Sequence, residues 1–180
     1  MKEIIFAGFG GQGVLTAGLV VAYTAMEQGL NTSWLPSYGA SMRGGKANST
    51  VKFGDDPDEI IGVPMMAEAD VLVAMNRPSL EYMAFCKPGA LILVNADSVE
   101  YDYVYPEGFD IVRLPAVELA YSVNNAKGAS IVMIGALIKK VGYFSVEDTK
   151  QSMANMFAET GKSKMEAANE AAFDAGYKAV

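Results

Sequence analysis

Apolar residues along the first 40 positions follow two different patterns. The stretch KEIIFAGF predicts a strand that leads directly into a glycine-rich turn. From Val14 onward, apolar residues recur at helical spacing and share one face of a helix, which we expect to end at Gly29. Residues 32–37 predict a second strand, closed by Pro36. This β–α–β order predicts a mainly parallel sheet with a right-handed crossover.

The remaining pattern alternates strands with short connections up to residue 115 and is helical beyond it. Residues 49–65 predict two extended segments joined by a turn at 54–58, which suits an antiparallel pair at a sheet edge. The other predicted elements are strands at 69–75, 89–97 and 109–115, a short helix at 76–86 that starts at Asn76 or Ser79, and helices within 116–144, 145–158 and 162–179. We therefore expect an α/β fold, a three-layer α/β/α sandwich with a Rossmann-like, mostly parallel sheet, helices on both faces and the antiparallel pair at one edge.

Length and composition narrow the classes of protein. A chain of 180 residues, of which 51% are hydrophobic, suits a single domain spanning 1–180. Acidic residues outnumber basic ones by 21 to 14, and the resulting net charge of −7 disfavours binding to a nucleic acid backbone. The N-terminal stretch shows no targeting pattern, and no apolar run approaches the ~20 residues that cross a bilayer. We therefore expect a cytoplasmic chain without a membrane partner.

Histidine and cysteine usage limits the chemistry that the chain can perform. The sequence has no histidine, which removes the usual proton shuttle at neutral pH and the commonest metal ligand. Its one cysteine, Cys86, cannot close an intrachain disulfide, form a Cys-based zinc site or ligate an iron–sulfur cluster alone, and is interpreted as a small buried residue. No placed pair of carboxylates suggests acid–base work. We therefore predict no metal site and no catalytic residue in this chain.

A glycine motif follows the first predicted strand. Gly8, Gly10 and Gly13 have the G-x-G-x-x-G spacing of a dinucleotide fingerprint, and Gly11 and Gln12 lie between them. Backbone N–H groups and the helix dipole can hold a phosphate at such a turn. However, the second strand ends in TSWLPSYG, without the acid that binds the ribose in nicotinamide sites. Two interpretations stay open, a phosphate-binding loop or a turn that lets strand and helix pack closely.

A second polar loop, within PSYGASMRGGKANST, follows the second predicted strand. It leaves the carboxyl end of that strand beside the glycine motif, where open α/β sheets bind ligands. Arg43 and Lys46 are positive charges in an acidic chain and suit anionic groups. Ser37, Tyr38 and Asn48 are further candidate binding residues in the loop. The alternative is a solvated loop, or a loop that is buried against another protein chain.

Together, GFGGQGVLTAG and SYGASMRGGKAN resemble the gamma subunit of 2-oxoacid:ferredoxin oxidoreductases, a chain that also occurs as one domain of single-chain pyruvate:ferredoxin oxidoreductases. The usual second motif of that family has a Pro-Glu pair where this chain has Ala40 and Ser41, which puts a role for that acid in doubt. The likeness continues in VMIGAL (132–137) and KMEAANEAAFDAGY (164–177), and it covers nearly the whole chain.

The resemblance implies a division of labour between subunits. Such enzymes convert a 2-oxoacid, coenzyme A and oxidised ferredoxin into acyl-CoA, CO2 and reduced ferredoxin. Thiamine diphosphate lies between the alpha and beta subunits, and iron–sulfur clusters lie in other subunits, such as a ferredoxin-like delta subunit. The gamma chain is non-catalytic alone, holds no redox cofactor and packs against the catalytic chains, and helping to receive coenzyme A is one implied role. Among substrates, 2-oxoglutarate or a branched-chain 2-oxoacid is favoured over pyruvate.

From this resemblance we hypothesise that residues 8–13 and 37–48 form one surface that faces the thiamine-bearing subunits. Arg43 and Lys46 would attract a coenzyme A phosphate or a carboxylate of a partner, and the glycine N–H groups would complete the cradle. Two other classes stay open. One is a free-standing dinucleotide-binding oxidoreductase of Rossmann type, against which the missing acid argues. The other is a nucleotide-binding regulatory module, against which neighbouring genes for thiamine enzymes would argue.

Overall fold

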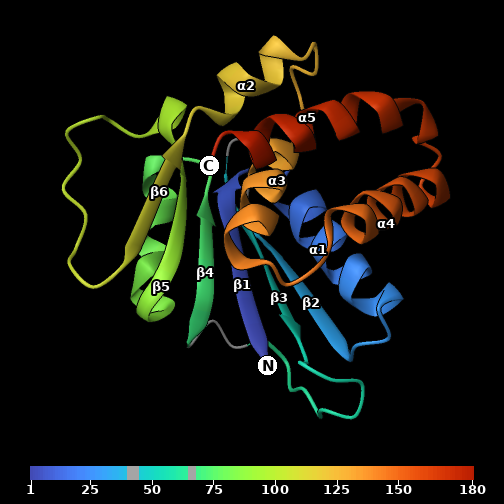
Figure 1. Cartoon of the computed structure of the whole chain (residues 1–180). Coiled ribbons are helices and arrows are strands. Elements are labelled where there is room, and N and C mark those ends of the chain that lie inside the picture. The colour runs from blue at the N-terminus through green and yellow to red at the C-terminus, as the bar shows by residue number, and fades with distance from the viewer. Residues whose placement is uncertain (40–44, 65–67) are drawn as a thin grey trace.

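A six-stranded sheet forms the centre of the computed structural model, which describes residues 1–39, 45–64 and 68–180. The strands lie in the order β2-β3-β1-β4-β5-β6 (Figure 1). Their bounds are β1 (Lys2–Phe9), β2 (Thr32–Tyr38), β3 (Lys46–Phe53), β4 (Ala69–Ala74), β5 (Cys86–Asn95) and β6 (Asp110–Leu114). The helices are α1 (Val14–Glu27), α2 (Ala116–Ser122), α3 (Ala129–Val141), α4 (Val146–Glu159) and α5 (Glu166–Lys178), with short 3-10 helices η1 (Arg77–Phe85), η2 (Ala96–Ser98) and η3 (Ser163–Met165).

The sheet is mixed, and its one reversed strand lies in the interior. Strands β1, β4, β5 and β6 pair in parallel, while β3 runs antiparallel to both of its neighbours, β1 and β2. The predicted α/β class is confirmed. An antiparallel pair does lie at one edge of the sheet, but it consists of β2 and β3 and not of the two segments predicted within residues 49–65. Strand β3 is inserted between the two strands of the opening β–α–β unit. Strands β2 and β3 pair as a hairpin, and next to their last strand pair the Gly39 N–H donates to the Lys46 carbonyl at 2.8 Å.

Two details of the predicted strands were wrong. The polar loop predicted after residue 37 is shorter, because β2 continues to Tyr38 and β3 already begins at Lys46. The second extended segment predicted before residue 65 is no strand, since residues 59–64 have no regular structure. The side-chain amide of Asn31 instead donates to the Pro57 and Glu59 carbonyls, which fixes that stretch as a loop.

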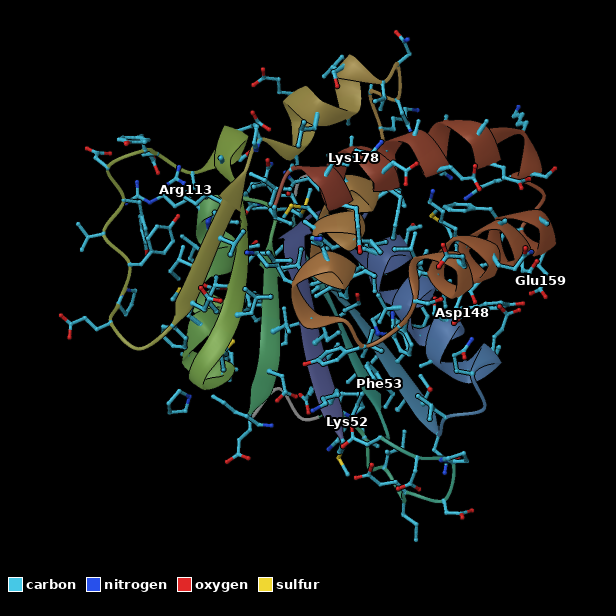
Figure 2. All side chains as sticks on the ribbon, in the orientation of Figure 1. Lys52, Phe53, Arg113, Asp148, Glu159 and Lys178 are labelled. Atoms are coloured by element: carbon cyan, nitrogen blue, oxygen red, sulfur yellow. The ribbon has the colours of Figure 1, made fainter. Side chains whose placement is uncertain are left out.

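The two faces of the sheet are covered unequally. Helices α1, α3, α4 and α5 pack on one face, and the side chains between them and the sheet form the larger hydrophobic core (Figures 1 and 2). The other face is covered by η1 and by the stretch 99–109, through Leu80, Met83, Val99 and neighbouring aromatic rings. Helices on both faces were predicted, and on this second face the helix is of the 3-10 type. Asn76 caps it, accepting from the Ser79 N–H at 3.1 Å.

Helix α3 is the most deeply buried helix, and α5 crosses it at very close range. Every residue of α3 from Ser130 to Ile138 is buried. A methyl group added to Gly135 would collide with the Phe173 carbonyl of α5, and one added to Gly176 of α5 would collide with the Val132 carbonyl of α3. The two backbones therefore touch through a pair of glycines, one on each helix, because any larger side chain at either position would meet the facing backbone.

Candidate functional site

The glycine motif forms a tight turn between β1 and α1. Gly11 has a φ of +99° and Gly13 a φ of +77°, values that side chains other than glycine rarely adopt. Gly8 serves close packing, because a Cβ there would lie 2.8 Å from Cγ1 of Val14. The turn also contacts the end of the β2–β3 hairpin, since the Gly10 N–H donates to the Gly45 carbonyl at 2.9 Å. The two glycine-bearing loops are thus neighbours, as the sequence predicted.

Gln12 points into the sheet rather than toward solvent. Its Oε1 accepts hydrogen bonds from the Phe9 N–H and from Nδ2 of Asn76, both at 2.7 Å. Its Nε2 lies 3.4 Å from the Met75 carbonyl, to which it donates. Gln12 was proposed from sequence as a cofactor-binding residue, but here its amide ties the carboxyl end of β1 to that of β4.

This amide contact fills the position where doubly wound folds bind dinucleotides. That position is the crevice outside two adjacent parallel strands whose connections leave toward opposite faces of the sheet. Strands β1 and β4 are such a pair, because β1 leads to α1 on one face and β4 leads to η1 on the other. With Gln12 and Asn76 occupying the crevice, and without an acid in β2, the geometry argues against a dinucleotide site.

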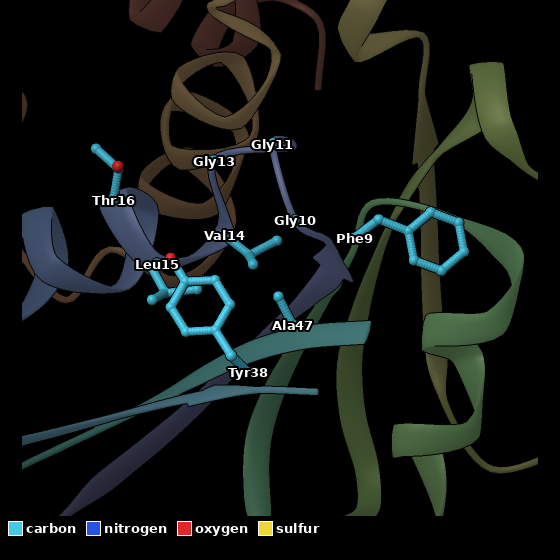
Figure 3. Close-up of a pocket in the computed structure, with 9 residues that line it drawn as sticks. All are labelled: Phe9, Gly10, Gly11, Gly13, Val14, Leu15, Thr16, Tyr38 and Ala47. Carbon is cyan, nitrogen blue, oxygen red and sulfur yellow. The ribbon is translucent and has the colours of Figure 1, made fainter. Parts of the chain in front are cut away.

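An open pocket of about 270 Å3 lies on the α1 side of the glycine turn (Figure 3). Its lining consists mainly of the turn, the first residues of α1 and the hairpin end, namely Phe9, Gly10, Gly11, Gly13, Val14, Leu15, Thr16, Tyr38 and Ala47. Figure 3 shows the Tyr38 ring reaching from β2 toward Leu15, while the Phe9 side chain turns away. Tyr38 is 52% exposed, so its ring is available to a ligand.

The first turn of α1 determines which kind of ligand this pocket favours. Gly13 is the N-cap residue, and within the described part of the chain no side chain caps the helix and no acid occupies its first turn. The N–H groups of Val14, Leu15 and Thr16 therefore lack intrahelical partners, and the positive end of the helix dipole faces the same side. Such an arrangement favours an anionic group, such as a phosphate or a carboxylate.

The strand pairing divides the predicted binding residues between the two faces of the sheet. Tyr38 and its cross-strand neighbour Ala47 face the pocket. Side chains alternate along a strand, so Lys46 and Asn48 on β3, and Ser37 opposite Asn48 on β2, face the other side. Arg43 lies outside the described residues. The pocket therefore combines the glycine turn with Tyr38 but not with Lys46.

Lys46 and Asn48 have partners of their own on the η1 side. Nζ of Lys46 lies 2.7 Å from Oε1 of Glu81, and hydrogen bonding to this carboxylate raises the pKa of the Lys46 ammonium. Nδ2 of Asn48 donates to the Tyr82 hydroxyl at 2.8 Å. Both contacts attach β3 to η1. They account for these two polar residues without a ligand.

Thr16 is a pocket residue that the sequence analysis did not identify. It is half-buried, lines the pocket and occupies the third position of α1 after the Gly13 cap. The signal was present in the sequence, because the residues that open a helix directly after a phosphate-type glycine turn supply its N–H groups. The predicted set stopped at Gly13 and so missed the first turn of the helix.

The described part of the chain offers few side chains that could bind a metal ion or a redox cofactor. No group of three or more His, Cys, Asp and Glu side chains there is placed to hold a metal ion. Cys86 is partly buried at the start of β5, and this burial raises the pKa of its thiol to about 11. Of the helices in that same part of the chain, none combines the length and apolar character needed to cross a membrane.

Known proteins match this chain along nearly its whole length. A family model described as pyruvate ferredoxin/flavodoxin oxidoreductase matches residues 3–179. The 2-oxoglutarate synthase subunit KorC of Methanothermobacter marburgensis is 37% identical over 161 residues, which are 86% of this chain and 85% of that protein. The ketoisovalerate oxidoreductase subunit VorA of the same organism is 34% identical over 175 residues, and there the chain spans 97% of its own length but only 35% of that relative.

A solved structure shares the fold as well. The gamma subunit of a keto/oxoacid ferredoxin oxidoreductase from Geobacter sulfurreducens PCA superposes with a TM-score of 0.81 at 26% identity. The superposition covers 99% of this chain and 97% of that one. The mixed sheet and the helices on its larger core are therefore features that the two chains have in common.

Proposed function

The chain belongs to the pyruvate ferredoxin/flavodoxin oxidoreductase family, and from this membership we propose that residues 1–180 act as the gamma-type subunit of a 2-oxoacid:ferredoxin oxidoreductase. The complex would convert a 2-oxoacid, coenzyme A and oxidised ferredoxin into acyl-CoA, CO2 and reduced ferredoxin. The family match over residues 3–179 carries this proposal. The likeness to a gamma subunit along almost its full length supports the assignment of this particular role.

In this proposal the redox and carbon chemistry belong to partner chains. Thiamine diphosphate is held by alpha and beta subunits, and iron–sulfur clusters are held by other subunits such as a ferredoxin-like delta chain that passes electrons to ferredoxin. Cluster ligation normally requires several cysteine thiolates, and this sequence contains Cys86 alone and no histidine. The proposed role is therefore to complete an enzyme whose reacting groups lie elsewhere.

The pocket at the start of α1 is the proposed contact with coenzyme A. Coenzyme A carries phosphate groups, and the uncapped first turn of α1 offers backbone N–H donors and a positive dipole to such groups. Gly10, Gly11 and Gly13 leave room for close approach, and the Tyr38 ring offers an aromatic face. The role predicted for Arg43 stays a prediction.

The substrate and the location follow the same proposal. We favour 2-oxoglutarate or a branched-chain 2-oxoacid over pyruvate, and two of the relatives, KorC and VorA, are named for 2-oxoglutarate and for ketoisovalerate. A low cysteine content suits the reducing cytoplasm, where we expect the complex to work.

Purification through a tag on this chain tests the proposal. Under anaerobic conditions, larger thiamine-enzyme chains should co-purify from the native cells. The eluate should reduce a dye only when both coenzyme A and a 2-oxoacid are present. Parallel assays with pyruvate, 2-oxoglutarate and a branched-chain 2-oxoacid identify the substrate. A chain that purifies alone, or partners without this activity, would remove the proposal and return attention to nucleotide titrations.

A further inference from the structure

The glycine turn, residues 9–13, has a backbone with few steric limits of its own. Three of its five residues, Gly10, Gly11 and Gly13, are glycines, and glycine adopts many conformations. The N–H groups at the start of α1 converge on one anionic group only when the turn before them keeps a single conformation. Among the described residues, every side-chain hydrogen bond that involves the turn is made by Gln12. Gln12 is therefore the side chain that holds the turn in place.

Gln12 closes the turn with two hydrogen bonds to one residue. Its backbone N–H donates to the Phe9 carbonyl at 3.0 Å, and its side-chain Oε1 accepts from the Phe9 N–H at 2.7 Å. The amide also packs against β1, since a Cβ added to Gly8 would lie 2.9 Å from Oε1. Gln12 directly precedes Gly13, the N-cap residue of α1. The direction in which the chain enters α1 thus depends on how the Gln12 amide is held.

Asn76 determines which way round the Gln12 amide lies. Oδ1 of Asn76 accepts from the Ser79 N–H at 3.1 Å and from the Ser79 hydroxyl at 2.8 Å, which leaves Nδ2 to face Gln12. Nδ2 can only donate, and it lies 2.7 Å from Oε1 of Gln12. Oε1 is therefore kept beside the Phe9 N–H, while Nε2 faces the Met75 carbonyl. Asn76 is only 4% exposed, so water does not readily replace it.

We propose that Asn76 is a positioning residue for the pocket at the start of α1, and that it acts through Gln12 to hold the glycine turn in its anion-binding conformation. Asn76 does not line that pocket, and it begins η1, which packs on the opposite face of the sheet. The ligand, coenzyme A, is taken from the proposed function, on which this inference rests. A turn that is ordered before the ligand arrives avoids the entropy cost of ordering it on binding.

Capping of η1 is the simpler role for Asn76, and it uses a different atom. The cap requires Oδ1, which accepts from Ser79, whereas Nδ2 makes the contact with Gln12. Serine is as good an N-cap residue as asparagine, but it has no second group at the position of Nδ2. Asn76→Ser therefore keeps the cap and removes the hydrogen bond to Gln12.

Steady-state kinetics of the assembled complex test the positioning role. Asn76→Ser should raise the KM for coenzyme A about fivefold, as expected for the loss of one neutral hydrogen bond. The kcat at saturating coenzyme A should stay within about twofold of the original, because the reaction of the bound molecule is unchanged. Gln12→Ala should raise the same KM at least as much. In the Gln12→Ala background, Asn76→Ser should add no further increase, since its effect passes through Gln12.

Asn31→Ser is the matched control for the asparagine substitution. Asn31 is exposed beside the start of β2, at the end opposite Tyr38, and its amide donates to the carbonyls of Pro57 and Glu59. The control therefore removes an amide with two hydrogen bonds without touching the glycine turn. It should leave the KM for coenzyme A unchanged.

Hydrogen–deuterium exchange on the purified chain measures the turn itself, without ligand or partner. The amides of Phe9, Gly10 and Gln12 are all hydrogen-bonded there. They should exchange about fivefold or more faster in Asn76→Ser, while the amides of α3 keep their rates. Exchange at the turn that matches the unaltered chain would overturn the inference.

The positioning role and the proposed function fail in different ways. If the unaltered chain yields no complex with activity that depends on coenzyme A, the proposed function fails and the inference falls with it. If an active complex forms, the inference alone is wrong when Asn76→Ser leaves the KM unchanged, or when its effect multiplies with that of Gln12→Ala. A fall in kcat without a change in KM would also contradict it, because that result indicates less folded enzyme. Circular dichroism checks the fold of each variant.

Discussion

Replacing Gly135 or Gly176 with alanine should lower the free energy of unfolding by about 3 kcal/mol, the upper range for inserting a group into a packed core. Each new methyl group would meet a backbone carbonyl of the facing helix, and a backbone cannot turn aside as a flexible side chain can. Helices α3 and α5 would have to separate, which loosens the larger hydrophobic core around Ile134 and Phe173. For a chain of this size, the melting temperature should fall by about 6 to 12 °C.

Gly62→Ala is the matched control for these glycine substitutions. Gly62 has open space around its Cβ position and no positive φ, so alanine there should leave the melting temperature within about 1 to 2 °C of the original. Thermal unfolding followed by circular dichroism measures all three variants. A melting temperature for Gly135→Ala that matches that of Gly62→Ala would contradict the close crossing of α3 and α5.

Thr16→Glu should raise the KM of the assembled complex for coenzyme A about tenfold, equivalent to about 1.4 kcal/mol of repulsion between the new carboxylate and a bound phosphate. The same change should slightly stabilise the chain, because a glutamate at the third position of a helix interacts favourably with its positive end. A variant with a higher KM for coenzyme A and an unchanged or higher melting temperature has lost binding without losing its fold. Steady-state kinetics and thermal unfolding provide the two measurements.

Thr16→Gln is the control that keeps the size of the side chain and removes the charge. It should leave the KM for coenzyme A within about threefold of the original, since the proposed effect is electrostatic and a neutral amide adds none of it. Raising the salt concentration should narrow the difference between the two variants. If glutamate and glutamine change the KM equally, the pocket at α1 does not receive an anionic part of coenzyme A.

Much of the fold could be predicted because its signals are local. The glycine turn and the helical spacing after Val14 each depend on a few adjacent residues. The start of α4 is equally local, because the Asp148 N–H donates to Ser145 Oγ at 3.0 Å. Between α2 and α3, Asn124 takes a φ of +57°, a conformation that its short polar side chain tolerates. These elements needed no knowledge of distant contacts.

The position of β3 could not be predicted in the same way. Four of its first five residues, in KANST, are polar, so the sequence predicts a strand only from Ser49 and a loop before it. In the structure those polar residues alternate faces, with Asn48 bonded to Tyr82 and Ser49 bonded to the Val14 carbonyl at 2.8 Å. Both partners are distant in sequence, and only the assembled sheet shows why polar residues belong in an interior strand.

Only part of the candidate site could be predicted from the sequence, again because some of its contacts join residues that are distant along the chain. The glycine turn and Tyr38 were correctly expected to be neighbours, because both lie at strand ends on the same edge of the sheet. Sequence spacing could not show that Gln12 turns inward to Asn76, a contact between residues 64 positions apart. It also could not show which face Lys46 takes, since a shift of one residue in strand register moves every side chain to the other side.

Removal and return of this chain is the measurement that tests the central claim most directly. Cells lacking the chain should yield partner subunits that still bind thiamine diphosphate but show little 2-oxoacid oxidation dependent on coenzyme A. Adding the purified chain back should restore that activity in proportion to the amount of complex formed. Partner subunits that oxidise the 2-oxoacid with coenzyme A equally well without this chain would contradict its role as a required gamma subunit.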